Sequence, residues 1–123
     1  MPIDRAAICR NFTQLRDTFD SHADSVDTLI AEIIAKLKTV LRGPYLTKFV
    51  DAWDKAATTE ERIAAAEAAC TRLTRLLQSG APIEPWVGEA QELLAHLIKL
   101  LQALKALREL EKAMAGHVTD WCG

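Results

Sequence analysis

The sequence predicts an all-α protein that folds as an elongated antiparallel three-helix bundle, up-down-up. Of its 123 residues, 50% are hydrophobic and 26% charged, with only five glycines and four prolines, a composition that favours helix over sheet. Apolar residues also recur at alternating spacings of three and four, the 3.5-residue repeat of helices that pack as in a coiled coil. The alternative is a four-helix bundle, and in either case residues 1–123 form a single domain.

The first predicted helix spans residues 4–42, from Asp4, which can cap its N-terminus, to the turn at Gly43 and Pro44. About 38 residues rise roughly 57 Å, a length that favours a bundle over a globin-like packing. Its seam, the apolar row that faces other helices, comprises Ile8, Phe12, Leu15, Phe19, His22, Val26, Leu29, Ile33, Leu37 and Val40.

The second predicted arm covers residues 44–57 and 59–78. Gly43 suits the left-handed conformation that ends a helix, and Pro44 suits the first turn of the next. Thr58 and Glu61 have the spacing of a capping box, which would start a helix at residue 59. The three-helix bundle treats this region as one kinked or broken arm, whereas the four-helix alternative treats it as a short hairpin.

The last predicted helix spans residues 85–115 and ends at Gly116, leaving residues 116–123 as a tail. Besides a leucine seam, it carries a second apolar row about 100° away on the helix surface. The combined apolar arc, about 160°, is wider than the roughly 100° that a core-facing helix needs. We therefore expect the second row to bind a partner helix or a second copy of the chain, unless the second arm covers it. That row comprises Leu94, Ile98 and Leu101.

His22 is a polar residue in an apolar seam, and Glu60 interrupts the apolar row of the second arm in the same way. In an antiparallel bundle the two residues should lie within about one helical turn of each other in height. A buried hydrogen bond between them would form a polar layer that fixes the register of the arms. The alternative is that His22 marks a ligand or cofactor site in the bundle interior.

Four carboxylates spaced by three, four and three residues line an outward strip of the first helix. The strip is either a solvated face or a docking site for a basic partner protein. A metal site is not favoured, because parallel carboxylates on one helix rarely converge on an ion. The last helix offers complementary charge at a similar height, from Lys99, Lys105, Arg108 and Lys112. The strip comprises Asp17, Asp20, Asp24 and Asp27.

Composition and motifs indicate a protein without catalytic, cofactor or metal sites. The chain contains no phosphate-binding glycine loop and no HExxH, GxSxG or CxxC motif. The formal charge of −2 does not favour nucleic acid or anionic lipid as a partner. No apolar run is long enough to span a membrane, and the N-terminus does not resemble a secretion signal. Three widely spaced cysteines, Cys9, Cys70 and Cys122, suit reduced thiols in the cytoplasm.

The sequence therefore predicts a non-catalytic protein–protein interaction module: an adaptor, a small subunit or a homo-oligomeric scaffold. Its expected partner is another protein or a second copy of the chain, bound through an apolar helix face. The alternative function is a ligand or cofactor carrier with its site near His22.

Overall fold

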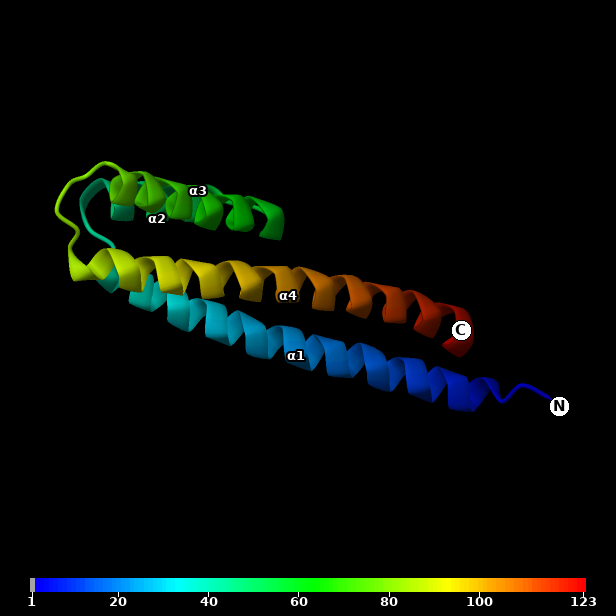
Figure 1. The fold of residues 1–123 in the computed structure, drawn as a ribbon. Coiled ribbons are helices and arrows are strands. Elements are labelled where there is room, and N and C mark those ends of the chain that lie inside the picture. Colours follow the sequence, from blue (N-terminus) through cyan, green and yellow to red (C-terminus); the bar gives the residue numbers. More distant parts are fainter. Residues whose placement is uncertain (1) are drawn as a thin grey trace. The chain divides into compact units, whose positions relative to one another are not determined.

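A computed structural model of the chain describes residues 2–123 and contains four helices (Figure 1). These are α1 (Arg5–Val40), α2 (Gly43–Lys55), α3 (Thr59–Gln78) and α4 (Pro85–Cys122). The described residues include no strand, so the predicted all-α class is confirmed. Within the same residues, no helix is both long and apolar enough to cross a membrane.

Side chains cap two of the helices as their sequences predict. Asp4 accepts a hydrogen bond at Oδ1 from the backbone N–H of Ala7, at 3.0 Å. The Thr58 hydroxyl accepts one from the backbone N–H of Glu61, at 3.1 Å, and the Glu61 carboxylate accepts one from the N–H of Ala57, at 2.8 Å. Each cap gives a partner to an N–H group that the first helical turn cannot satisfy.

The region predicted as a kinked or broken arm is two helices that lie side by side (Figure 1). Gly43 has a φ of +53°, in the left-handed region that suits glycine, at the entry to α2. Residues 56–58 then reverse the chain between α2 and α3. The ring of Trp53 on α2 lies under the guanidinium of Arg62 on α3, 5.2 Å from its centroid.

The chain divides into two compact units, each described by itself. Unit 1 comprises the described residues up to Asp27 together with Ala103–Gly123, and unit 2 comprises Thr28–Gln102. Unit 2 therefore holds α2, α3 and part of each long helix, whereas unit 1 holds only the first part of α1 and the last part of α4.

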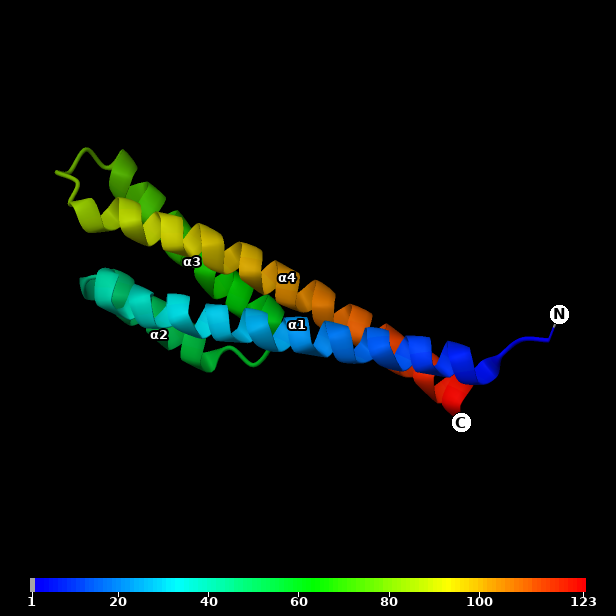
Figure 2. The same ribbon diagram turned by 90° about the horizontal axis from the view of Figure 1, so that it is seen from below.

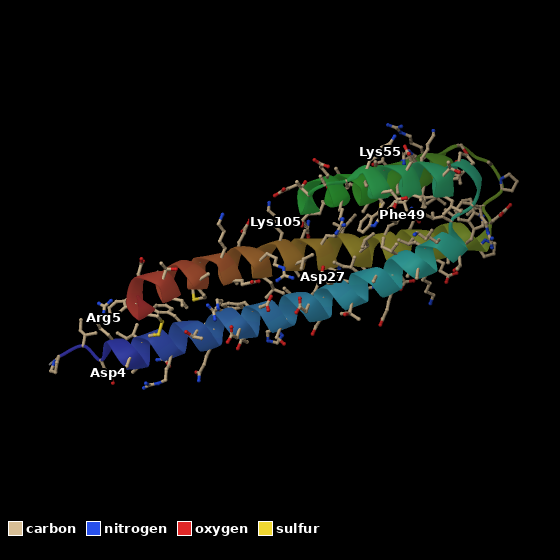
Figure 3. All side chains as sticks on the ribbon, turned by 180° about the vertical axis from the view of Figure 1, so that it is seen from behind. Asp4, Arg5, Asp27, Phe49, Lys55 and Lys105 are labelled. Atoms are coloured by element: carbon tan, nitrogen blue, oxygen red, sulfur yellow. A yellow bond between two sulfur atoms is a disulfide. The ribbon has the colours of Figure 1, made fainter. Side chains whose placement is uncertain are left out.

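Unit 2 contains most of the apolar core. Of the 17 buried hydrophobic residues in the described chain, 15 belong to it, contributed by all four of its helical segments. Phe49 on α2 has no exposed surface and points inward, whereas Lys55 on the same helix points away from the core (Figure 3). Tyr45 and Trp86 connect α2 to α4 through a tilted ring contact, with centroids 5.8 Å apart.

Unit 1 is an antiparallel pair of helical segments, with the N- and C-termini at the same end (Figure 2). A disulfide joins Cys9 to Cys122, whose Cα atoms lie 5.2 Å apart. Arg5 lies against the last turns of α4 (Figure 3) and donates a hydrogen bond to the Asp120 carbonyl at 2.8 Å. Its guanidinium also lies 4.7 Å from the centroid of the Trp121 ring.

The predicted end of the last helix at Gly116 is wrong, because α4 continues to Cys122. A glycine in a helix interior costs only about 1 kcal/mol relative to alanine. The contacts that Trp121 and Cys122 make with α1 offset this cost. The predicted tail is therefore part of the helix pair.

Candidate functional site

On one side of the helix pair in unit 1, Arg108 of α4 meets carboxylates from α1. Its Nη1 donates to Oδ1 of Asp20 at 2.8 Å and to Oε2 of Glu111 at 2.7 Å. Its Nη2 donates to Oδ1 of Asp24 at 3.2 Å and to Oδ2 of Asp27 at 3.3 Å. The hydrogen bonds that Arg108 donates, to Glu111 first and then to Asp20, raise its pKa, so the guanidinium stays charged.

This cluster contains three of the four carboxylates of the acidic strip, which was expected to be a solvated face or a docking site for a basic partner. Asp20, Asp24 and Asp27 are engaged with Arg108 of the same chain, as the predicted charge complementarity between the helices suggested. Asp17 pairs with its neighbour Arg16 at 3.2 Å and remains exposed. The strip contributes to holding α1 against α4 in unit 1, and we do not propose it as a docking site.

The other side of unit 1 carries two apolar stripes, which together we name the uncharged face. Each stripe has six residues with spacings of four, three, four, three and four. None of the twelve is buried, and Leu15 and Leu110 are each 44% exposed. On α1 the stripe comprises Ile8, Phe12, Leu15, Phe19, His22 and Val26, and on α4 it comprises Ala103, Leu107, Leu110, Met114, His117 and Trp121.

Charged side chains are absent from a wide arc around each stripe. Successive residues of a helix are 100° apart around its axis. The charged residues of α1 in unit 1 occupy one arc around that axis, bounded by Arg5 and Arg10, and the remaining 220° or so carries no charge. On α4 the charged residues of unit 1 likewise occupy one arc, bounded by Asp120 and Glu111, and the remaining 180° or so carries no charge. An amphipathic surface helix normally places charged residues over the part of its surface that faces solvent.

Contacts between the two helices show that both uncharged arcs lie on the same side of the pair. The Phe12 and His117 rings stack at 4.6 Å between centroids, and both residues belong to the stripes. The Cys9–Cys122 disulfide lies toward the opposite edge of both helices, the edge that also carries Arg108. The pair thus has one charged side and one continuous uncharged side.

A shallow hollow of about 470 Å³ lies beside Leu15. It is lined by α1 residues with uncharged polar side chains, Asn11, Gln14 and Thr18, together with Leu15 itself. The three polar residues lie on the flank of the α1 stripe that points away from α4. A hollow lined mainly by uncharged polar side chains therefore borders the uncharged face and shares Leu15 with it.

The residues predicted to bind a partner on the last helix lie elsewhere. Leu94 and Leu101 have no exposed surface, and Ile98 is half-buried. All three belong to unit 2, where segments of four helices surround the core. The wide apolar arc of α4 is thus covered within the chain, which corrects the expectation that this row emerges, and we do not propose these residues as a binding surface.

The predicted buried layer of His22 and Glu60 is also wrong. Both residues are exposed, and no polar or charged residue is buried in the part of the chain that the structure describes. His22 belongs to unit 1 and Glu60 to unit 2. His22 therefore lies at the surface of unit 1. The described residues also contain no group of three His, Cys, Asp or Glu side chains arranged to hold a metal ion.

The expectation of three reduced thiols is corrected by the Cys9–Cys122 disulfide. Cys70 alone is free, and it is half-buried. Burial, followed by the nearby charge of Glu67, raises the pKa of the Cys70 thiol, so little of it is present as reactive thiolate near neutral pH.

Sequence reasoning missed the stripe on α4 because it ended that helix at Gly116. The stripe includes His117 and Trp121, which lie beyond that glycine. The uninterrupted spacing of three and four residues from Ala103 to Trp121 is the signal that could have revealed it.

No family model, curated protein or solved structure matches the chain.

Proposed function

We propose that this chain is a non-catalytic protein-interaction module that binds a partner protein through the uncharged face of unit 1. The observation that supports the proposal is the pair of parallel stripes, Ile8 to Val26 and Ala103 to Trp121, which lie on one side and carry no charge. Protein interfaces are depleted in charged residues at their centres and enriched in aromatic residues and Met. The uncharged face has this composition, with Phe12, Phe19, Met114 and Trp121.

The energetics of unit 1 support the same conclusion. Complete burial of an apolar side chain contributes roughly 1.5 to 3 kcal/mol, and Leu15 and Leu110 each keep 44% of their surface exposed to water. Unit 1 contains only two helical segments, so it offers these side chains no third helix. A bound protein would contribute the missing burial.

Unit 2 serves, in this proposal, as the folded scaffold that supports the interaction module. We propose that its four helical segments form a four-helix bundle. The fully buried Phe49, Leu73 and Leu97, which come from three different helices, support that arrangement.

The Cys9–Cys122 disulfide favours an oxidising compartment over the predicted cytoplasm, because disulfides persist mainly where thiols are not kept reduced. Alkylation of free thiols in the native source, before and after reduction, tests this location. One thiol labelled before reduction and three after it support an oxidising compartment, whereas three labelled before reduction place the protein in a reducing one.

Photo-crosslinking in the native source tests the proposed function. A photoreactive amino acid replaces Thr18 in the hollow beside the uncharged face, and a control replaces the exposed Lys55 of unit 2. We expect the probe at residue 18 to form a crosslink to a protein, and the probe at residue 55 to form none with that protein. Absence of any protein crosslink at residue 18 would contradict the proposal.

A further inference from the structure

We propose that the partner of the uncharged face is a second copy of this chain. In the resulting dimer, the two helical segments of unit 1 pack against the same two segments of the other copy, so that four segments share one apolar core. This inference rests on the proposed function, because it names the partner for the same surface.

The exposed area of the chain is large enough to supply such an interface. The chain exposes 7689 Å². A compact monomeric protein of 13.6 kDa exposes about 6,600 Å², so the excess is about 1,100 Å². This excess belongs to the whole chain, and it is larger than the area of about 800 Å² that a standard protein interface buries on each partner. Burying the uncharged face against a second copy would reduce the exposed area per chain.

The charge distribution favours a second copy over a charged partner. A twofold interface places the same surface on both sides, so any charge near its centre would meet a charge of the same sign. Arg108 and its carboxylates lie on the opposite side of the helix pair. Arg5 differs, because its guanidinium lies 4.7 Å from the centroid of the Trp121 ring, at the end of the face. The centre of the uncharged face therefore holds no charge that would attract an oppositely charged protein or repel a second copy.

The two stripes also share one repeat. Their spacings are identical, which is the repeat of residues that interdigitate between helices in a bundle. Both stripes carry large apolar side chains, Phe12, Leu15 and Phe19 on α1 and Leu107, Leu110 and Met114 on α4. Packing of α1 in one copy against α4 in the other would therefore bury large apolar side chains from both helices.

The flank of the α1 stripe argues against a membrane as the occupant. Helices that lie on membranes carry Lys or Arg beside their apolar face. The corresponding positions here hold uncharged polar residues, among them Gln14, Thr18 and Ser25. These side chains can donate and accept hydrogen bonds at the rim of a protein interface.

Sedimentation equilibrium of the purified full chain over a range of concentrations tests the inference. We expect the wild-type mass to approach twice 13.6 kDa with increasing concentration. Leu15→Glu and Leu110→Glu each place a charge on the uncharged face, and each should raise the dimer dissociation constant at least about tenfold. Ile83→Glu in unit 2 is the matched control, since Ile83 is 53% exposed and lies outside the face, and it should leave the constant unchanged.

Circular dichroism of each variant shows whether helicity is retained. If a Glu variant unfolds, Leu15→Gln and Leu110→Gln, which add no charge, replace it in the same measurement. A dimer that persists in both folded face variants would overturn the inference, because it would use another surface.

A wild-type chain that stays monomeric at every concentration would also overturn the inference, and so would binding of the monomer to phosphatidylcholine vesicles through the uncharged face. The crosslinking experiment distinguishes this inference from the proposed function. If the chain is a monomer and the probe at residue 18 still crosslinks to a different protein, the proposed function holds with another partner. A monomer without any such crosslink contradicts both.

Discussion

The two units use different means to hold their helices together. Unit 2 buries 15 of the 17 buried hydrophobic residues of the described chain, whereas unit 1 buries only Ala23 and Leu104. In place of a large core, unit 1 has a disulfide, a stacked Phe12–His117 pair and the Arg108 cluster. A helix pair can thus be fixed by covalent and polar links along one side.

This difference has a functional consequence. Around Leu94 and Leu97, α4 buries most of its apolar face within its own chain, which leaves little apolar surface for a partner. In unit 1 the links along the charged side position α1 and α4 while Leu15 and Leu110 stay exposed. The unit with the smaller core is therefore the one suited to binding.

The largest expected effect comes from truncating the core of unit 2. Phe49 is completely buried, so Phe49→Ala should reduce the free energy of unfolding by about 3 to 5 kcal/mol, through lost transfer energy and a cavity. Phe12→Ala in unit 1 is the matched variant at a half-buried ring. It should cost roughly half of the 1.5 to 3 kcal/mol that full burial contributes. Urea denaturation at low protein concentration, where a dimer dissociates, measures both.

If Phe49→Ala and Phe12→Ala reduce the free energy of unfolding equally at low protein concentration, the claim that unit 2 has the larger core would be contradicted. A cost for Phe12→Ala that grows with protein concentration would instead indicate that the Phe12 ring becomes buried between copies.

A smaller effect is expected from removing the disulfide of unit 1. Cys9→Ser combined with Cys122→Ser removes a disulfide between residues 113 positions apart. The double variant should have a free energy of unfolding lower by about 2 to 4 kcal/mol, mainly because the unfolded chain gains conformational entropy. Hydrogen exchange should accelerate most at the ends of α1 and α4 that the link joins. Amides of α2 and α3, in unit 2, should exchange almost as before.

Cys70→Ser is the matched control for the cysteine variants, because Cys70 is free and lies in unit 2. It should leave exchange in unit 1 unchanged. Uniform acceleration across both units in the double cysteine variant would show that the disulfide stabilises the whole fold and not unit 1 in particular.

Local sequence signals predicted most of the helix boundaries because their causes are local. Asp4 and the Thr58–Glu61 pair cap helices through hydrogen bonds to residues three or four positions away. Gly43 has the left-handed backbone that its position suggested. The seam that the apolar repeat predicted for the first helix is right at Leu37 and Val40, which are buried. It is wrong at Leu29, which is 47% exposed, whereas its neighbour Ile30 is buried.

The candidate site depended on contacts between distant segments, which the sequence alone did not reveal. Helical propensity predicts that α4 ends at Gly116, but the helix continues to Cys122. Contacts of Trp121 and Cys122 with residues at the start of α1 stabilise this extension. Leu94 and Leu15 both belong to apolar helical rows in the sequence, yet only Leu15 is exposed. That difference arises because α2 and α3 belong to unit 2, whereas unit 1 has no further helix.

The smallest effect tests this extension of α4. Gly116 is exposed in the helix, its backbone does not have a positive φ, and a Cβ there would meet no atom within 4 Å. Gly116→Ala should therefore stabilise the chain by about 0.5 to 1 kcal/mol, by restricting the unfolded backbone.

Gly88 meets the same conditions in the part of α4 that belongs to unit 2, so Gly88→Ala is the matched variant. Thermal unfolding should show a higher midpoint for both variants. Hydrogen exchange should distinguish the two variants. If unit 1 opens before unit 2, only Gly116→Ala should slow the exchange of the amides at residues 103–122. Destabilisation by Gly116→Ala would instead show that the helix ends at this glycine. The α4 stripe would then lose His117 and Trp121, and the uncharged face would be shorter than the one proposed to join two copies.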